Sequence, residues 1–212
     1  AQTDVAGHYE IEGLPSGTYR VQFTDGSGDY LEEFYNNAMA LETGVDIIVS
    51  AKTIVAGIDA SLANASKIAG TVTGPDATVP LEGIEAAVYR WNGSCEYWEW
   101  MGGVQTDAGG HYTIGGLPAG TFRVQFTDWS GEYNQEVYND AADLASGADL
   151  VVLGESTLAN VDASLVSASK IAGTVTGLGG IQPLQGIEAT VYRFDGASEE
   201  WEWIGGVQTD SD

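Results

Sequence analysis

The chain repeats itself without a gap. Residues 1–103 align with residues 104–206, each position matching the one 103 places later (104 − 1 = 103), and residues 207–212 begin the unit again. A unit of this length can bury its own core as a domain, unlike the roughly 20–50 residue units of solenoids. We therefore expect a string of separate domains, called repeats below.

Strand signals of one repeat can be followed from Ala65 to Ser167. They predict a complete β-sandwich repeat at 65–167, with 1–64 as the C-terminal part of a preceding repeat and 168–212 as the N-terminal part of a following one. Left alone, each incomplete part would expose unpaired strand edges. Either the chain is a window on a longer array, or separate subunits join head to tail and close a shared sandwich. The overlap of "VQTDSD" with "AQTDVA" favours the window.

The charge balance limits the partners. There are 31 acidic and 7 basic residues, a net charge of −24, so we expect no nucleic-acid binding and expect cations as charge partners. No run of 18 apolar residues occurs, and no membrane insertion is expected in this segment. Cys95 is the single cysteine and Ser198 takes its place in the next copy, so the repeat design includes no disulfide.

Hydrophobic alternation predicts an all-β fold. The clearest strand places Phe122, Val124 and Phe126 on one face and polar side chains on the other, as in an antiparallel sheet with one solvated face. Residues 139–148 lack alternation and predict one or two helical turns. Together the signals favour tandem transthyretin-like or Ig-like β-sandwiches of about seven antiparallel strands. The other expected strands lie at 67–74, 84–91, 96–107, in the "HYTI" stretch, at 149–153 and at 157–165.

The order "GTVTG…PLxGIxAxVYR…TDxxGxYxIxGLPxGTxRVQF" resembles the carboxypeptidase regulatory-like and collagen-adhesin B-type domains, and it spans the whole unit. The resemblance implies a transthyretin-like (prealbumin-like) sandwich in a stalk, adhesive or structural module of a secreted bacterial surface protein. It implies no catalysis.

Many B-type relatives carry a lysine–asparagine isopeptide cross-link beside a buried acid. Here Thr71, Val72 and Thr73 stand where the lysine is expected, and Phe126 stands in place of the glutamate. The cross-link is therefore predicted to be absent. Lys67 and Lys170 precede the strand and are interpreted as solvated lysines at a strand edge.

Two acidic turns are candidate calcium sites. Oxygen side chains recur at every second position, as Asp25, Ser27 and Asp29 in one copy and as Asp128, Ser130 and Glu132 in the next. Alternate residues of a bending loop can converge on Ca²⁺, which takes six to eight oxygen ligands. The helix-loop-helix calcium motif has glycine at its sixth position, where this chain has tyrosine. A solvated acidic turn is therefore the preferred interpretation, and calcium is the one candidate cofactor.

A tryptophan-rich strand is a candidate carbohydrate platform. Trp98 and Trp100, with Trp201 and Trp203 in the next copy, are interleaved with glutamates, and indole rings can stack on sugars. Trp98 and Trp100 share strand parity with Val104, however, so the preferred interpretation puts them in the core or at a contact between repeats. Gly102 and Gly103 predict a bulge in this strand.

No catalytic constellation is found, and we expect no enzyme. The sequence favours a structural repeat of an extracellular filament, stalk or cell-surface adhesin, in which copies associate head to tail through both termini. Identical contacts repeated along one axis generate such a string, because the movement that relates one copy to the next does not return to the first copy and form a ring. The alternative is a carbohydrate-binding or calcium-dependent adhesive module that binds host or matrix glycans.

Overall fold

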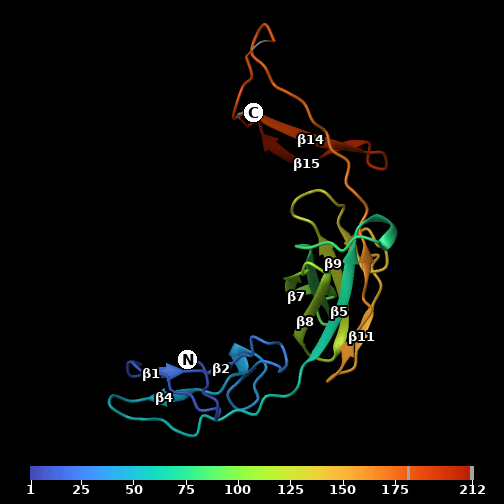
Figure 1. The fold of residues 1–212 in the computed structure, drawn as a ribbon. Helices are drawn as coiled ribbons and strands as arrows, with labels where there is room; N and C mark the ends of the chain where they lie inside the picture. Colours follow the sequence, from blue (N-terminus) through green and yellow to red (C-terminus); the bar gives the residue numbers. More distant parts are fainter. Residues whose placement is uncertain (181, 211–212) are drawn as a thin grey trace. The chain divides into compact units, whose positions relative to one another are not determined.

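The structure is a computed structural model that describes residues 1–180 and 182–210. The chain divides into two compact units, Ala1–Ala168 and Ser169–Asp212. Both consist of strands and turns (Figure 1), and the short helical pieces of the described chain are 3₁₀ turns at Leu41–Thr43 and Pro75–Ala77. The all-β fold class is confirmed.

A complete two-sheet sandwich lies within residues 65–167 and is called the central sandwich below. One sheet has the order β10-β9-β6-β7, with β11 also paired to β9; the other has the order β12-β5-β13, with β8 paired to β5. The strands are β5 (Ser66–Thr73), β6 (Glu85–Asn92), β7 (Tyr97–Gln105), β8 (His111–Leu117), β9 (Gly120–Thr127), β10 (Glu136–Val137), β11 (Leu150–Val152), β12 (Thr157–Leu158) and β13 (Ala163–Ser164).

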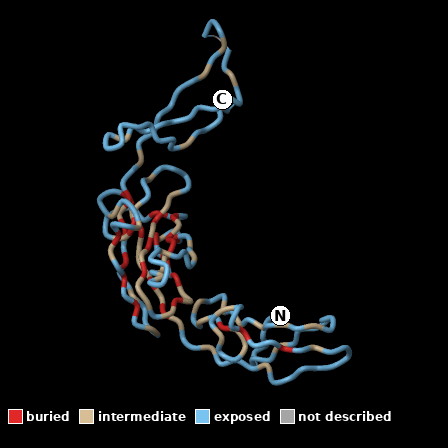
Figure 2. Tube along the Cα trace, turned by 180° about the vertical axis from the view of Figure 1, so that it is seen from behind, coloured by how far each residue is buried: buried red, intermediate tan, exposed pale blue. Residues whose placement is uncertain are grey.

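The core of the central sandwich is made by alternate residues of its strands. Phe122, Val124 and Phe126 of β9 are 0% exposed, as the alternation predicts, and they belong to one buried cluster with Ile68 and Val72 of β5. The buried residues are concentrated in this part of the chain (Figure 2). Burial of such apolar side chains is the main force that holds the two sheets together.

The last strands run parallel to their partner, unlike the other pairs of this sandwich. Thr157 pairs with Lys67 and Ala163 pairs with Val72, both in parallel. The chain leaves the first sheet after β11 and reaches the second at β12. A tight hairpin imposes antiparallel pairing, whereas a connection that changes sheets does not. For this segment the structure corrects the expectation of antiparallel strands.

The turn at Asp107 and the stretch 139–148 can be compared with what the sequence predicts for them. Asp107 Oδ1 accepts hydrogen bonds from the backbone N–H groups of Gly109 and His111, both at 2.8 Å, which closes the turn after "VQTD". Residues 139–148, for which helical turns were predicted, contain turns without a helix. The corresponding stretch of the first copy holds the 3₁₀ turn at Leu41–Thr43.

The N-terminal segment, residues 1–64, is much less buried than the corresponding residues 104–167. Its strands form two short antiparallel pairs, β1 with β4 and β2 with β3. Glu33, Gly44 and Ile47 are its buried residues. The strands are β1 (Gly17–Tyr19), β2 (Gln22–Phe23), β3 (Glu33–Phe34) and β4 (Ile47–Val49).

The unit that begins at Ser169 is an antiparallel hairpin preceded by an extended stretch. Its strands are β14 (Glu188–Asp195) and β15 (Glu200–Gln208), which correspond to β6 and β7. No residue described within this unit is buried (Figure 2). It is called the C-terminal segment below.

Candidate functional site

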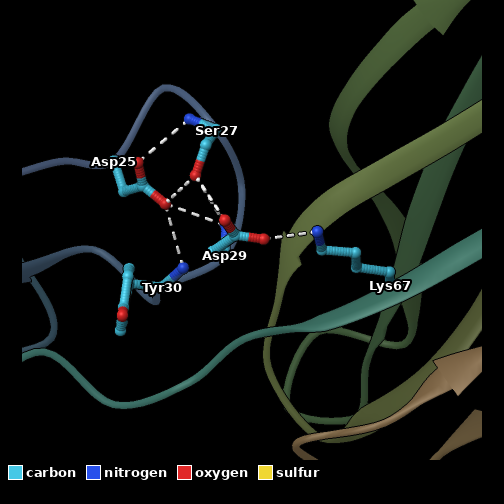
Figure 3. A network of polar contacts seen from close by, with 5 residues as sticks. All are labelled: Asp25, Ser27, Asp29, Tyr30 and Lys67. Carbon is cyan, nitrogen blue, oxygen red and sulfur yellow. Dashed lines mark hydrogen bonds and ion pairs between the residues drawn. The ribbon is translucent and has the colours of Figure 1, made fainter.

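The turn at residues 25–30, called the joint turn below, is closed by one carboxylate. Asp25 Oδ2 accepts hydrogen bonds from the backbone N–H groups of Asp29 at 2.8 Å and Tyr30 at 3.1 Å, and from the hydroxyl of Ser27 at 2.7 Å (Figure 3). Asp25 Oδ1 accepts from the backbone N–H of Ser27 at 3.0 Å. Aspartate at the first position of such a turn replaces backbone pairing that the short loop cannot supply.

The joint turn should persist to low pH. Hydrogen bonds from Ser27, and from the backbone of Tyr30 and Asp29, lower the pKa of Asp25 from 3.8 to about 2. Because the pKa is lowered in the folded state, the stabilisation is fully present above the ordinary value and is lost only as the pH falls through about 2. We expect a carboxyl-carbon NMR titration to give that midpoint. Asp25→Asn serves as control, and a midpoint near 3.8 would contradict the closed turn.

The joint turn is tied to the central sandwich by an ion pair. Asp29 Oδ1 lies 2.5 Å from Lys67 Nζ, and the hydrogen bond from this ammonium is the main reason why the pKa of Asp29 is lowered (Figure 3). Lys67 lies inside β5 rather than before it and is paired rather than simply solvated, which corrects the sequence interpretation. An ion pair this exposed adds about 1 kcal/mol at most, so it orients the joint more than it stabilises it.

Glycines bring the joint turn into backbone contact with the end of β8. The carbonyl oxygen of Gly28 accepts a hydrogen bond from the Gly116 N–H at 2.8 Å. A Cβ atom added at Gly115 would lie 2.5 Å from that oxygen, closer than real Cβ atoms approach. The first copy has Glu12 at the position of Gly115. Sequence analysis did not identify this contact, although the Glu12/Gly115 difference between otherwise similar copies marks it.

The joint turn and its counterpart at residues 128–133 make the same main-chain connection to the residue that begins the next repeat. In the first, the backbone N–H of Ala65 donates to Asp29 O at 2.8 Å, and in the second, that of Ala168 donates to Glu132 O at 2.8 Å. Isolated bridges accompany them, between Tyr30 and Asn64 in one copy and between Tyr133 and Ser167 in the other. The path out of each repeat therefore follows one local pattern.

Asp25 and Asp128, the first residues of the two candidate calcium turns, use their carboxylates to close those turns. Asp128 Oδ2 accepts from the backbone N–H groups of Glu132 and Tyr133, and from the Ser130 hydroxyl, as Asp25 does in the first copy. Within 1–180 and 182–210, no group of three or more His, Cys, Asp and Glu side chains is arranged to hold a metal ion. The geometry favours the acidic turn that the sequence already preferred. Calcium binding at these turns stays a prediction.

The tryptophans of β7 lie on the outer face of their sheet. Val104 pairs with Ala86 on the core side, but the register shifts between Val88 and Tyr89, and beyond the shift Trp100 pairs with Tyr89. The bulge expected near Gly102 is therefore present. Because it adds one residue, it reverses the parity, and the expectation that Trp98 and Trp100 share a face with Val104 is wrong. Trp100 is 60% exposed.

The outer-face aromatics make a local cluster. The Trp98 ring lies 5.2 Å from the Trp91 ring, centroid to centroid, and the Arg123 guanidinium sits 4.3 Å from the Trp98 centroid. Such a contact between a guanidinium and an indole face is attractive and holds the ring in place. The C-terminal segment repeats the motif, with Phe194 and Trp201 5.4 Å apart. Trp201 and Trp203 are also exposed.

Residues considered for a cross-link are ordinary parts of the core or its edge. Val72 and Phe126 are fully buried among apolar side chains, while Thr71 and Thr73 are partly exposed. In the described parts of the chain, no helix is both long and apolar enough to cross a membrane.

A shallow acidic hollow of about 320 Å³ was not predicted from the sequence. It is lined by residues that include Glu136, Asp140 and Asp162. Burial, and then the Asp140 charge, raise the pKa of Glu136. Glu136 begins β10 and Asp140 follows it closely, whereas Asp162 comes from the segment between β12 and β13, so only folding adds the third carboxylate.

Comparison with known proteins gives distant structural similarities. No protein-family model and no curated protein matches the chain. Transthyretin from Sparus aurata is 15% identical with a TM-score of 0.31, and aligns over 50% of this chain and 97% of its own. The shaft pilin spaA from Lactobacillus rhamnosus GG is 17% identical with a TM-score of 0.31, over 65% of this chain. A streptococcal ancillary pilin is 14% identical with a TM-score of 0.37, over 92% of this chain.

The chain spans 57% and 60% of the lengths of these two pilins. Because the identities and TM-scores are low, function is argued below from the residues of this chain.

Proposed function

We propose that the chain is a structural repeat of an extracellular bacterial filament, stalk or cell-surface adhesin, assembled head to tail from β-sandwich repeats. The observation that carries the proposal is the recurring joint. Ala65 donates a main-chain hydrogen bond to the joint turn, and Ala168, 103 residues later (168 − 65 = 103), donates the same bond to the corresponding turn at 128–133. A regular string of repeats requires that the chain leave each repeat in the same way.

The composition supports this role. A net charge of −24 keeps a long string of repeats solvated and mutually repelling along its sides. Contacts between strings are then disfavoured relative to contacts along a string. No residue set in the sequence supplies a nucleophile with an adjacent base, so the role proposed is mechanical and adhesive rather than catalytic.

Immunogold electron microscopy of the producing cells tests the proposal. Antibody raised against the 212-residue chain is expected to label fibres outside the cells at regular intervals, since each repeat carries the same epitopes. Labelling confined to the cell interior, or irregular labelling of cell surfaces without fibres, would refute the filament role.

A carbohydrate-binding adhesive module is the second candidate. The observation that favours it is the outward position of Trp100 and Trp203, both 60% exposed. Exposed indoles can stack on sugar rings. If isolated matrix glycans shift the tryptophan emission of the chain, and Trp100→Ala removes the shift, binding belongs to the repeats as well as to the assembled fibre.

A further inference from the structure

The two end segments retain some strand pairs of the repeat. In the N-terminal segment, β1 pairs with β4 in the register of the β9–β11 pair of the central sandwich. Likewise, β2 pairs with β3 in the register of the β9–β10 pair. In the C-terminal segment, β14 pairs with β15 and has the same bulge as the β6–β7 pair. Each of these pairs has both of its strands within one segment.

The strands that fail to form are those whose partner lies in the other segment. In the central sandwich β5 pairs with β8 and with β12 and β13. Residues 8–14 correspond to β8, and 169–176 to β5 (111 − 103 = 8; 66 + 103 = 169). Neither stretch is a strand, and neither are 54–55 and 60–61, the counterparts of β12 and β13. The partner that these stretches of the N-terminal segment share in the central sandwich is β5, and in this chain the β5 sequence recurs at 169–176.

A groove occupies the place of that strand. It has a volume of about 650 Å³ and is bounded by residues 9–14 and 52–59, with Ile47 among the residues that line it. Ile11 and Leu14 at its wall are 44% and 41% exposed, whereas their counterparts Ile114 and Leu117, which belong to the buried core cluster of the central sandwich, are 5% and 3% exposed. The groove thus exposes apolar side chains whose counterparts are buried in the central sandwich.

We propose that this groove binds residues 169–176 of a second copy of the chain, which enter as the β5 strand. The stretch "ASKIAGTVTG" is identical at 65–74 and 168–177, so the strand seated in the central sandwich shows how its copy would sit. Ile171 is 89% exposed, while its counterpart Ile68 is fully buried. Docking buries such side chains and supplies main-chain partners to both walls, as in strand addition to an open edge.

This contact rests on the proposed head-to-tail assembly and specifies which residues of two copies meet. Each copy would receive a strand at its N-terminal segment and donate one from its C-terminal segment. Such a heterologous contact continues from copy to copy and forms a fibre if it does not close into a ring. The β14–β15 hairpin of the donor would lie beside β1 and β2, as β6 lies beside β9.

The floor of the groove is already formed. The Tyr9 hydroxyl donates to Ile58 O at 2.6 Å, as the Tyr112 hydroxyl donates to Val161 O at 2.6 Å in the central sandwich. There β5 passes over the bond at Gly70, where an added Cβ would lie 2.0 Å from Val161 O. The strand can therefore seat only with glycine at this position.

The donor residue at that crossing is Gly173, and it offers a selective test. An added Cβ meets nothing within 4 Å at Gly173 or at Gly196 within the chain. At Gly93, the counterpart of Gly196, a Cβ makes only ordinary contacts, the nearest at 3.7 Å. Gly173→Ala should therefore block docking without disturbing the chain itself, and Gly196→Ala is its matched control.

Sedimentation velocity of the 212-residue chain over a dilution series measures the effect. We expect the wild type and Gly196→Ala to associate into oligomers that grow with concentration, and Gly173→Ala to weaken association by roughly tenfold or more. Association that is absent in the wild type, or unchanged in Gly173→Ala, overturns strand docking. Fibres labelled on cells would still support the filament role, so the two proposals fail separately.

Disulfide trapping, in a Cys95→Ser background, places the contact and its register. Thr71 pairs with His111 in the central sandwich, so Thr174 of one copy should lie opposite His8 of another. Mixed Thr174→Cys and His8→Cys chains are expected to give a covalent dimer, and Thr174→Cys with Glu12→Cys is the out-of-register control. Equal yields from both mixtures would overturn the register. If a Thr174→Cys/His8→Cys double variant cross-links within one chain, the groove is filled by the chain's own residues 169–176, and the proposal that a second copy fills it is refuted.

Discussion

Phe126→Ala is expected to lower the free energy of unfolding of the central sandwich by about 3–5 kcal/mol. The Phe126 ring is fully buried and lies edge-on to the Tyr112 ring, 5.6 Å away between centroids. Truncation removes these contacts and leaves a cavity that strands paired on both sides cannot collapse to fill. Denaturant unfolding followed by NMR signals of β9 measures the loss.

The first copy supplies the control, because Phe23 stands in the same "VQFTD" sequence. Phe23 is partly exposed and contacts Tyr9 at 5.6 Å between centroids. In dilute, unassociated chains Phe23→Ala should therefore cost much less than Phe126→Ala. Equal losses would mean that the N-terminal segment buries its apolar face as completely as the central sandwich does.

Gly70→Ala is expected to destabilise the central sandwich by about 3 kcal/mol or more, at the upper end of overpacking effects. The added Cβ would lie 2.0 Å from Val161 O and 3.1 Å from Tyr112 Cε1. The strand cannot shift away easily, because the Val161 N–H donates to Ala69 O at 3.1 Å and the Thr71 N–H donates to Asp162 Oδ1 at 2.8 Å. The carbonyl must move, which breaks its hydrogen bond with Tyr112.

Thermal unfolding of the central sandwich, measured beside Gly93→Ala, checks this expectation. Position 93 tolerates a Cβ at ordinary contact distance, so the control separates steric conflict from the general effect of replacing glycine. Burial raises the pKa of Tyr112 far above its usual range. A lower tyrosine titration midpoint in Gly70→Ala would show that the hydroxyl has become exposed. An unchanged unfolding midpoint would contradict the close approach.

Strand positions and core residues followed well from the sequence where local chemistry alone decides them. Phe122, Val124 and Phe126 alternate with polar residues because one face of β9 meets the core and the other meets solvent. The turn at Asp107 was predictable for a similar reason, since the aspartate bonds to backbone groups within four residues. Neither result needs information from distant parts of the chain.

The face of the tryptophans could not be predicted by the same rule. Counting by twos from Val104 places Trp100 in the core, but one extra residue near Gly102 turns it to solvent. The glycines indicate that a bulge is possible, whereas its position depends on pairing with β6. Lys67 was misinterpreted for a related reason, because its partner Asp29 lies 38 residues away and only folding brings them together.

By itself, the sequence determined the period of the chain, the all-β class and the apolar face of strands without a bulge, such as β9, because these depend on side-chain order along the backbone. The tertiary structure decided which of the identical stretches become strands. "SKIAGTVT" forms the strand β5 at 66–73, whereas the same eight residues at 169–176 form no strand. The difference is the partner, since a β-strand gains its hydrogen bonds and its burial from neighbours that its own residues do not contain.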